Sequence, residues 1–197
     1  MRNPPHRNEL LNLAHQLVQN HLLQGALAID ATIGNGHDTI CLAQWVGSSG
    51  LVYGFDIQAS ALATTRQRLQ DAQLLSVVQL IQANHAELMQ HIDPEHHAKI
   101  NVCMFNLGYL PGSDKSIQTQ SSSTLTALNA ALTLLAPQGL ITILAYPGHA
   151  GGDLETANVA DWCAELNSAE VTVREYLSQN PKASAPKLFT IEKNSAR

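Results

Sequence analysis

Seven predicted strands, of which the last two follow each other without a helix, constrain the fold of this chain more than any other feature. We expect them at 26–31, 51–55, 76–81, 100–105, 140–145, 171–177 and 187–192. Parallel neighbours in a sheet need a crossover of roughly a dozen or more residues, which is usually helical. The segment between the last two strands has few strong helix formers, so we expect the final strand to run antiparallel. The pattern predicts an α/β fold with a mostly parallel sheet.

Helices are expected between the earlier strands, on both faces of the sheet. Their predicted ranges are 9–23, 37–46, 60–71, 124–135 and 153–166, with a short helix over 84–91. The helix over 37–46 is expected to turn four side chains toward the sheet: Ile40, Cys41, Trp45 and Val46. Pro137-Gln138-Gly139 is expected to end the preceding helix before the fifth strand begins.

A glycine turn follows the first strand, in the stretch Ala28-Ile29-Asp30-Ala31-Thr32-Ile33-Gly34-Asn35-Gly36-His37-Asp38-Thr39. Gly34 and Gly36 can adopt backbone conformations that other residues rarely take, and they leave space for a ligand. The helix that follows directs unpaired N–H groups at whatever lies on the turn. Two glycines alone are weak evidence, but between a strand and a helix they indicate a nucleotide-type cofactor loop.

A carboxylate at the end of the second strand supports an adenosine cofactor. Asp56 follows Gly34 at the roughly 20-residue spacing at which a carboxylate binds ribose hydroxyls. Nicotinamide enzymes and S-adenosylmethionine (SAM) enzymes share this spacing. Thr39 replaces the third glycine of the dinucleotide fingerprint, and Asp30 suits the ammonium of a methionine moiety better than a pyrophosphate. SAM is therefore favoured over a nicotinamide oxidoreductase, which would need a further catalytic domain.

Composition limits the partners and the compartment. At 197 residues we expect one domain, 1–197, in which residues 1–24 supply an N-terminal helix packed on the sheet. The net charge of −5 argues against a large nucleic-acid footprint, although a small one stays open. No segment resembles a membrane span or signal peptide, and three cysteines without C-x-x-C spacing fit the cytoplasm. The adjacent His96 and His97 are expected to be solvated rather than to bind a metal.

Polar, aromatic or glycine-rich segments follow five of the strands. They are 30–37, 56–58, 84–85, 106–111 and 146–149. Open α/β sheets bind ligands at the carboxyl ends of their strands, where the strand order reverses. We therefore expect one site that uses all five segments.

Asn106-Leu107-Gly108-Tyr109 resembles the Asn-Pro-Pro-Tyr box of many amino-directed methyltransferases, with Leu107 and Gly108 in place of the prolines. In that box, the Asn oxygen accepts a hydrogen bond from the target N–H and the Tyr ring packs on the substrate. An aliphatic amine with a pKa of about 10.4 must also lose a proton. His85 and His149 are candidates to accept it.

Four segments of the chain carry distinctive motifs. They are 30–39, 54–58, 105–112 with Asp114-Lys115, and 146–149 with Gly151-Gly152. Together they resemble the YtqB/MnmM family of SAM-dependent tRNA methyltransferases, also called putative rRNA methylases. The resemblance covers about 8–193. It implies a Rossmann-like seven-stranded class I methyltransferase fold, SAM as cofactor, and the anticodon arm of tRNA as partner. The implied reaction methylates 5-aminomethyl-2-thiouridine at the wobble position.

The strand ends and this resemblance assign roles to individual residues. The expected catalytic residues are Asn106, Tyr109 and His149. The expected cofactor-binding residues are Asp30, Thr32, Gly34, Asn35, Gly36, His37, Asp38, Asp56, Gln58, Asn84, His85 and Asn106. The expected substrate-binding residues are Leu107, Gly108, Asp114, Lys115 and Tyr146. Family members often carry Asp-Ser-His after the third strand, so Asn84 is expected to stand in for the missing adenine-side carboxylate.

Other functions stay open at this level. A SAM methyltransferase of a small amine would suit the acidic composition, and another RNA such as rRNA is a further substrate class. The chain could instead be a SAM-binding subunit without catalysis. A homodimer also stays open.

Overall fold

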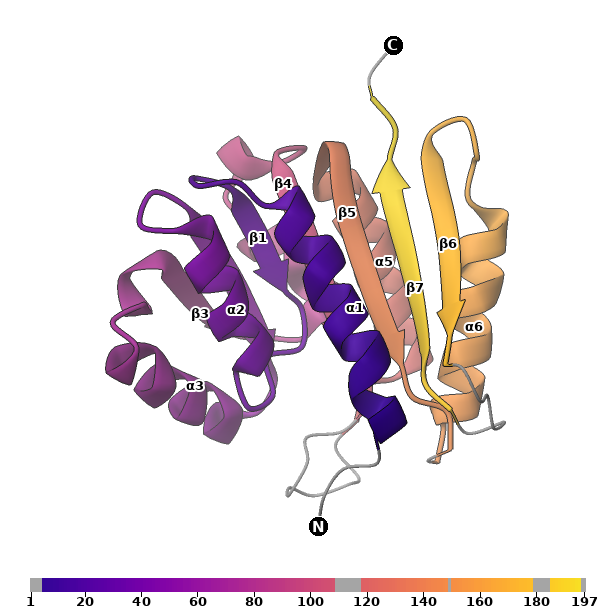
Figure 1. Ribbon diagram of the computed structural model, residues 1–197, viewed down its shortest axis with the longest axis horizontal. Helices are drawn as coiled ribbons and strands as arrows, with labels where there is room; N and C mark the ends of the chain where they lie inside the picture. Colours follow the sequence, from indigo (N-terminus) through magenta and orange to yellow (C-terminus); the bar gives the residue numbers. More distant parts are fainter. Residues whose placement is uncertain (1–4, 109–117, 149, 179–184, 196–197) are drawn as a thin grey trace.

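The computed structural model describes residues 5–108, 118–148, 150–178 and 185–195. Within these ranges, seven strands form one sheet in the order β3-β2-β1-β4-β5-β7-β6 (Figure 1). Their bounds are Leu27–Asp30 (β1), Leu51–Asp56 (β2), Val78–Gln82 (β3), Ile100–Asn106 (β4), Leu135–Ala145 (β5), Val171–Leu177 (β6) and Lys187–Lys193 (β7). The first five strands pair in parallel, and β7 runs antiparallel between β5 and β6. The predicted fold class is confirmed, including its antiparallel last strand.

Helices cover both faces of this sheet. Their bounds are Pro5–His21 (α1), His37–Val46 (α2), Ala59–Asp71 (α3), Leu88–His91 (α4), Ser121–Leu134 (α5) and Gly152–Glu165 (α6), with short 3-10 helices at Leu75–Val77 (η1), His85–Glu87 (η2) and Pro94–His96 (η3). One face is covered by α1, α2 and α3, and the other by α4, α5 and α6 (Figure 1).

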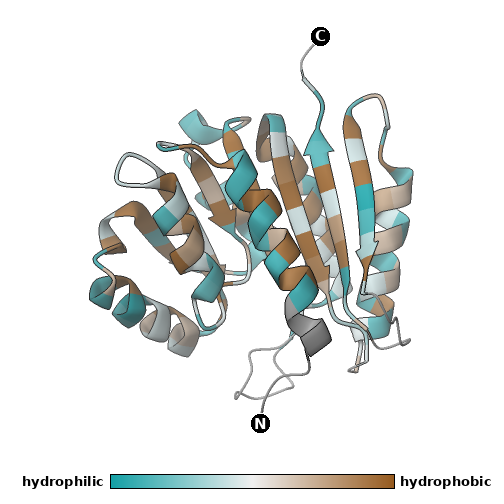
Figure 2. Cartoon of the chain, viewed as in Figure 1, coloured by the Kyte–Doolittle hydropathy of each residue, from teal (hydrophilic) through white to brown (hydrophobic). Residues whose placement is uncertain are grey.

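The central strands contribute to two apolar cores because successive side chains point to opposite faces. Ala28 of β1 and Val52 of β2 pack beneath α1, α2 and α3. Ile29 and Phe55, from the same two strands, pack on the opposite side with α4, α5 and α6. Figure 2 shows the result as apolar strands between helices whose hydrophilic residues lie mainly on the outside. Covering both faces explains why the strands read as nearly continuous apolar runs.

The N-terminal helix α1 lies on the centre of one face. Leu10 and Ala14 pack against Leu144 of β5 and Leu188 of β7. Val18, one turn further along, joins the core beneath α2 and α3. The four-residue spacing places these side chains on one face of the helix. This packing brings the polar residues of α1 close to the edge of α2.

The predicted turn at Pro137-Gln138-Gly139 is wrong, because these residues belong to β5. The pairing of β5 with β4 changes register between Ile100 and Val102. Gln138 has a φ of 63°, a left-handed conformation that accommodates an irregularity in a strand. Proline and glycine therefore mark a distortion within the strand.

The predicted sheet-facing side of α2 is also partly wrong. Its buried residues are Asp38, Thr39, Leu42, Ala43 and Val46. Ile40, Cys41 and Trp45 are only partly buried. One of them, Trp45, also contacts α1, where the His15 ring packs edge-to-face against it with ring centroids 5.7 Å apart. A second helix thus contacts a side chain that the sequence pattern assigned to the sheet.

The strand order reverses between β1 and β4. The chain runs outward from β1 through β2 to β3, and β4 then pairs with the opposite side of β1. The segments that leave the carboxyl ends of β1 and β4 diverge at this point. Open α/β sheets bind their ligands at such a reversal.

Replacing Leu42 with Ala tests the packing of α2 on the sheet. Leu42 is fully buried, so we expect the free energy of unfolding to fall by about 2–5 kcal/mol. Leu154→Ala on α6 is the matched control, because Leu154 is 63% exposed; it should change stability by less than about 0.5 kcal/mol. Urea unfolding followed by circular dichroism measures both, and equal losses would contradict the packing described.

Candidate active site

The turn between β1 and α2 depends on two left-handed glycines. Gly34 and Gly36 have φ values of 53° and 76°, with the half-buried Asn35 between them. The Gly36 N–H donates to the Ile33 carbonyl at 2.8 Å. A Cβ at Gly36 would collide with the side chain of Thr65 on α3. Both backbone conformation and space therefore require glycine at position 36.

Asp30 ends β1 as a carboxylate that is only 1% exposed. One oxygen accepts the Thr32 N–H at 3.1 Å, and the other accepts the Thr39 hydroxyl at 2.6 Å. Burial and the charges of Asp38 and Asp56 raise the pKa of the Asp30 carboxyl from 3.8 to about 7, against the effect of the two hydrogen bonds. Asp30 thus fastens the turn to α2, and its contact with a ligand ammonium stays a prediction.

Asp56, at the end of β2, is oriented by the turn itself. Its oxygens accept the N–H groups of Gly34 at 2.9 Å and Gln58 at 2.8 Å. Each carboxylate oxygen has two lone pairs, so both keep acceptor capacity. A fixed acceptor pair beside a glycine turn fits the ribose diol of an adenosine cofactor.

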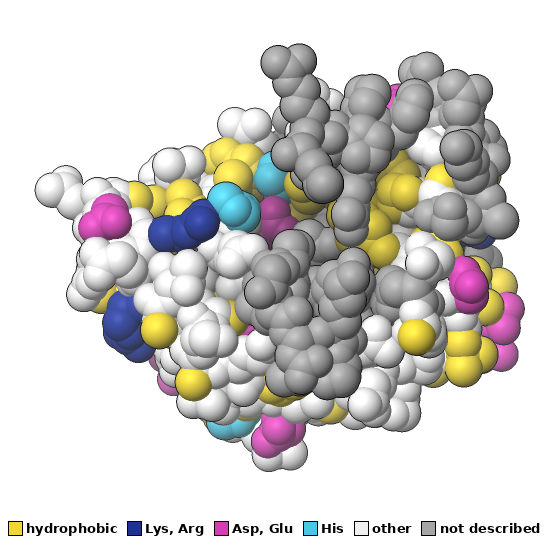
Figure 3. Space-filling view, turned by 90° about the horizontal axis from the view of Figure 1, so that it is seen from below, with side chains coloured by type: hydrophobic (Ala, Val, Ile, Leu, Met, Phe, Trp, Pro, Cys, Tyr) yellow, Lys and Arg dark blue, Asp and Glu magenta, His cyan; other side chains and the backbone are white. Residues whose placement is uncertain are grey.

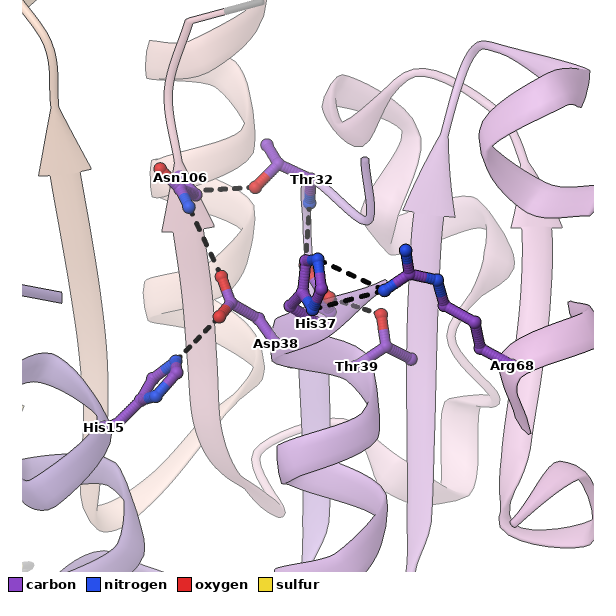
Figure 4. Close-up of polar contacts among 8 residues, drawn as sticks. His15, Thr32, His37, Asp38, Thr39, Arg68 and Asn106 are labelled. Carbon is purple, nitrogen blue, oxygen red and sulfur yellow. Dashed lines mark hydrogen bonds and ion pairs between the residues drawn. The ribbon is translucent and has the colours of Figure 1, made fainter. Parts of the chain in front are cut away.

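Asp38 lies between α1 and the end of β4 (Figure 4). Its Oδ1 lies 2.7 Å from Nε2 of His15, and its Oδ2 lies 3.4 Å from Nδ2 of Asn106. The backbone N–H of Asn106 donates to the Thr32 hydroxyl at 2.8 Å. The structure therefore brings together two predicted cofactor residues, the predicted catalytic Asn106, and one histidine that the sequence did not indicate.

His37 and Arg68 form a pair near the turn, joining α2 to α3. The Nη1 atom of Arg68 lies 3.2 Å from Nδ1 and 3.1 Å from Nε2 of His37. An atom equally close to both ring nitrogens must lie over the ring face. Figure 3, which looks onto the carboxyl ends of the parallel strands, shows basic and histidine side chains side by side on this face. A cationic group thus lies beside a turn rich in carboxylates.

Asn84 and His85 follow β3. The Asn84 side chain accepts the Ala86 N–H at 2.9 Å, and the Asn84 N–H donates to Glu87 at 3.2 Å, which closes a capping box. Nδ1 of His85 lies 3.3 Å from the Ala31 carbonyl, which places the ring against the end of β1. Burial lowers the pKa of His85, and its buried Nε2 has no hydrogen-bond partner among the described residues.

Leu107 and Gly108 continue from β4. Leu107 is buried, and its N–H donates to the Leu144 carbonyl at 2.9 Å. The Gly108 N–H donates to the Thr119 hydroxyl, and the Thr119 N–H donates back to the Gly108 carbonyl, both at 2.9 Å. The two ends of the segment between them are therefore joined.

Glu155 of α6 anchors this junction from inside the protein. It is 3% exposed and accepts the hydroxyls of Thr119 at 2.6 Å and Thr124 at 2.7 Å. Gln118 also donates to the Ala150 carbonyl at 2.7 Å, which links the junction to the segment after β5. No local pattern indicates the role of this carboxylate, because its partners lie more than 30 positions away.

The remaining predicted site residues fall into two groups. Tyr146 follows β5 and packs against the core formed by α1, β5 and β7. The other four lie outside the described residues: Tyr109, Asp114, Lys115 and His149. The roles of all five stay predictions.

Sequence reasoning missed four residues near the site: His15, Arg68, Thr119 and Glu155. Each acts on a partner far away in the chain, so no short motif includes both members of a pair. Thr39 was noted as a replacement for glycine, but its bond to Asp30 was not foreseen.

No metal site is evident in the described part of the chain, where no three His, Cys, Asp or Glu side chains gather to hold an ion. His96 and His97 are half-buried, contrary to expectation, and lie within hydrogen-bond distance of the Tyr53 hydroxyl and the Ile92 carbonyl. Over the same described ranges, no helix has the length and apolarity to cross a membrane. The cytoplasmic location stays a prediction.

Comparison with known proteins identifies relatives of this chain. Residues 52–192 match the family described as “Putative rRNA methylase”. The curated protein tRNA (mnm(5)s(2)U34)-methyltransferase, chloroplastic, from Arabidopsis thaliana is 39% identical over 173 residues, or 79% of this chain. The match covers 62% of the Arabidopsis protein, so the chain spans less than two thirds of that relative.

Two solved structures agree over nearly the whole chain. A putative rRNA-methylase from Clostridium thermocellum has a TM-score of 0.89 and 35% identity, covering 98% of this chain and 100% of that one. A putative methyltransferase from Streptococcus mutans, solved with SAH, has a TM-score of 0.83 and 35% identity, covering 98% and 99%. The predicted family resemblance is confirmed. The predicted enzyme class and cofactor, a methyltransferase that uses SAM, agree with these relatives.

Replacing Asp30 with Asn should change how stability depends on pH. Because its pKa is raised, folded Asp30 keeps its proton between about pH 4 and 7, where the unfolded chain has lost it. Its stabilising contribution is therefore lost as pH rises toward 7. Asn resembles the protonated acid but does not titrate. As pH rises from about 4 to 7, the variant should therefore gain stability relative to wild type by about 1.4 kcal/mol per pH unit, which amounts to a few kcal/mol in all.

Urea unfolding at about pH 4.5 and pH 8 measures this difference. Asp71→Asn on α3 removes an exposed carboxylate and controls for the loss of one charge. A difference between wild type and the Asp30 variant that stays constant across the two pH values would contradict the raised pKa.

Proposed function

Because this chain belongs to the putative rRNA methylase family, we propose that it is a SAM-dependent methyltransferase of tRNA. The proposed reaction converts 5-aminomethyl-2-thiouridine at the wobble position to 5-methylaminomethyl-2-thiouridine. The name of the Arabidopsis relative supports this substrate. The observation that carries the proposal is the Asn106 amide at the strand reversal, with its NH2 group directed to Asp38 and its oxygen left to accept an N–H.

The residues around the turn fit SAM. Bound SAM supplies an electrophilic methyl group, whose bond to sulfur breaks as the bond to the attacking nitrogen forms. Asp56 would accept the ribose hydroxyls, and Asn84 and His85 would border the adenine. Thr32, Gly34, Asn35, Gly36, His37 and Asp38 would surround the methionine portion.

The substrate residues would orient an amine. The nitrogen lone pair must point along the line of the sulfur–methyl bond, so positioning supplies much of the rate. In this proposal the Asn106 oxygen accepts one target N–H and thereby directs the lone pair. The amine must also lose a proton, and His85 stays one candidate to accept it, although its Nε2 atom is buried in this structure. His149 stays a second candidate.

An acidic protein can bind RNA through a small number of contacts. The net charge of −5 opposes a broad basic surface. Arg68, held over His37 beside the turn, could contact one phosphate near the target base. The proposal therefore implies a small RNA footprint, with a correspondingly weak dependence of affinity on salt.

Replacing Asp56 with Ala tests the cofactor part of the proposal. Hydrogen bonds to a charged group contribute about 1.5–3 kcal/mol each, so we expect the Kd for SAH to rise about tenfold or more. Asp56→Asn keeps one acceptor oxygen and should lie between the two. Isothermal titration calorimetry measures these affinities, with Asp71→Ala as the exposed control; an unchanged Kd in Asp56→Ala would remove Asp56 from the cofactor site.

Replacing Asn106 with Ala tests the substrate part. We expect transfer from labelled SAM to tRNA bearing 5-aminomethyl-2-thiouridine to fall by about a hundredfold, because the amine loses its positioning acceptor. Asn20→Ala on α1 is the control, since Asn20 is exposed. Nucleoside mass spectrometry of the digested tRNA identifies the product.

Three other outcomes would redirect the proposal. Methylation of a small amine without RNA would indicate a small-molecule enzyme, and methylation of rRNA would change the RNA class. Tight SAH binding with no methylated product from either source would indicate a SAM-binding subunit.

A further inference from the structure

The N-terminal helix contributes a side chain to the candidate site that no motif indicated. His15 of α1 contacts Asp38 of α2 at 2.7 Å, and Asp38 contacts the Asn106 amide at 3.4 Å (Figure 4). These residues lie 23 and 68 positions apart in the chain and meet only in the folded sheet. They form a continuous row of polar contacts that ends at the amide proposed to receive the target amine.

Asp38 determines which way the Asn106 amide faces. A carboxylate can only accept hydrogen bonds, so the amide group directed at Asp38 is the NH2 group and the amide oxygen faces elsewhere. The other end of Asn106 is held by its backbone N–H, which donates to the Thr32 hydroxyl at 2.8 Å. With both ends held, the oxygen has one preferred direction.

His15 in turn holds Asp38. The carboxylate has no proton to donate, so Nε2–H of His15 is the donor, and the 2.7 Å distance is typical of a strong hydrogen bond to an ionised acceptor. Asp38 is 7% exposed, and a buried carboxylate that lost this donor would gain by turning toward water. Trp45 fixes the His15 ring from another side, edge-to-face at an angle of 77°.

We infer that His15 is a positioning residue for methyl transfer, which fixes Asp38 and, through it, the direction of the Asn106 amide oxygen. The inference rests on the proposed function, because that function gives Asn106 its amine partner. Without the His15 donor, Asp38 can leave the amide, and the amide can then turn its NH2 group toward the substrate. Such a misplacement lowers the rate of the chemical step more than it lowers cofactor affinity.

A pair of substitutions separates the hydrogen bond from the space that His15 fills. His15→Phe keeps a ring beside Trp45 but removes the donor, whereas His15→Gln restores an N–H donor at similar reach. His21→Phe is the matched control, because His21 lies on the same helix with similar side-chain exposure, 24% against 22% for His15. Its Nδ1 lies 2.8 Å from the Leu17 carbonyl, away from Asp38.

We expect His15→Phe to lower kcat on the modified tRNA by about tenfold to a hundredfold. The Kd for SAH should rise by a clearly smaller factor, because Asp38 also borders the proposed methionine site but is only one of several residues there. His15→Gln should recover most of the lost kcat, and His21→Phe should equal wild type. Wild-type kcat in His15→Phe would overturn the inference. So would parallel losses of kcat and SAH affinity, or a Gln variant no better than Phe, since both indicate a merely structural role.

A second measurement needs no substrate. The side-chain NH2 resonances of Asn106, assigned by their absence in Asn106→Ala, report the contact with Asp38 in 15N-correlated spectra. They should shift in His15→Phe and stay in place in His21→Phe. If wild type fails to methylate tRNA, the proposed function fails, and these spectra still decide the coupling: unchanged Asn106 resonances in His15→Phe would overturn it.

Discussion

The carboxyl edge of the sheet depends on the burial of one carboxylate, Asp30. Removing a charge from water is costly, and here the hydrogen bonds from the Thr32 N–H and the Thr39 hydroxyl offset only part of that cost. The same bonds fasten the turn to the first turn of α2. Asp38 and Asp56 lie close enough to raise the Asp30 pKa, so the turn carries a concentration of negative charge. A pyrophosphate would be repelled there, whereas a ligand with ammonium and sulfonium charges would be attracted.

Much of the architecture could be predicted because it follows from local patterns. Apolar runs of strand length alternate with segments of helical periodicity, and this alternation predicts a parallel sheet. The segment between β6 and β7 has few helix formers, which predicts that β7 runs antiparallel. The glycine turn and Asp56 could be found because their spacing is fixed by the strand–helix–strand unit that contains them. Asn106 could be placed at this edge because it lies at the carboxyl end of a predicted strand, and β4 ends at the reversal.

The contacts that hold these residues could not be predicted, since they join distant parts of the chain. His15 reads as an ordinary polar position of an amphipathic helix until α1 is placed on the sheet. Glu155 reads as an exposed residue in the first turn of α6, yet it is buried and accepts hydrogen bonds from two threonine hydroxyls. The sheet-facing side of α2 was partly misjudged, and one of its residues, Trp45, contacts His15 of α1, a partner that periodicity does not indicate.

The joining of Gly108 to Thr119 has a consequence for how such enzymes diverge. The two residues exchange hydrogen bonds, and the Thr119 hydroxyl also donates to Glu155, so the contact is fixed to α6. Doubling the number of residues between two joined positions costs only about 0.6 kcal/mol of loop-closure free energy. Relatives can therefore differ in chain length between Gly108 and Thr119 at little cost to the stability of β4 or the glycine turn.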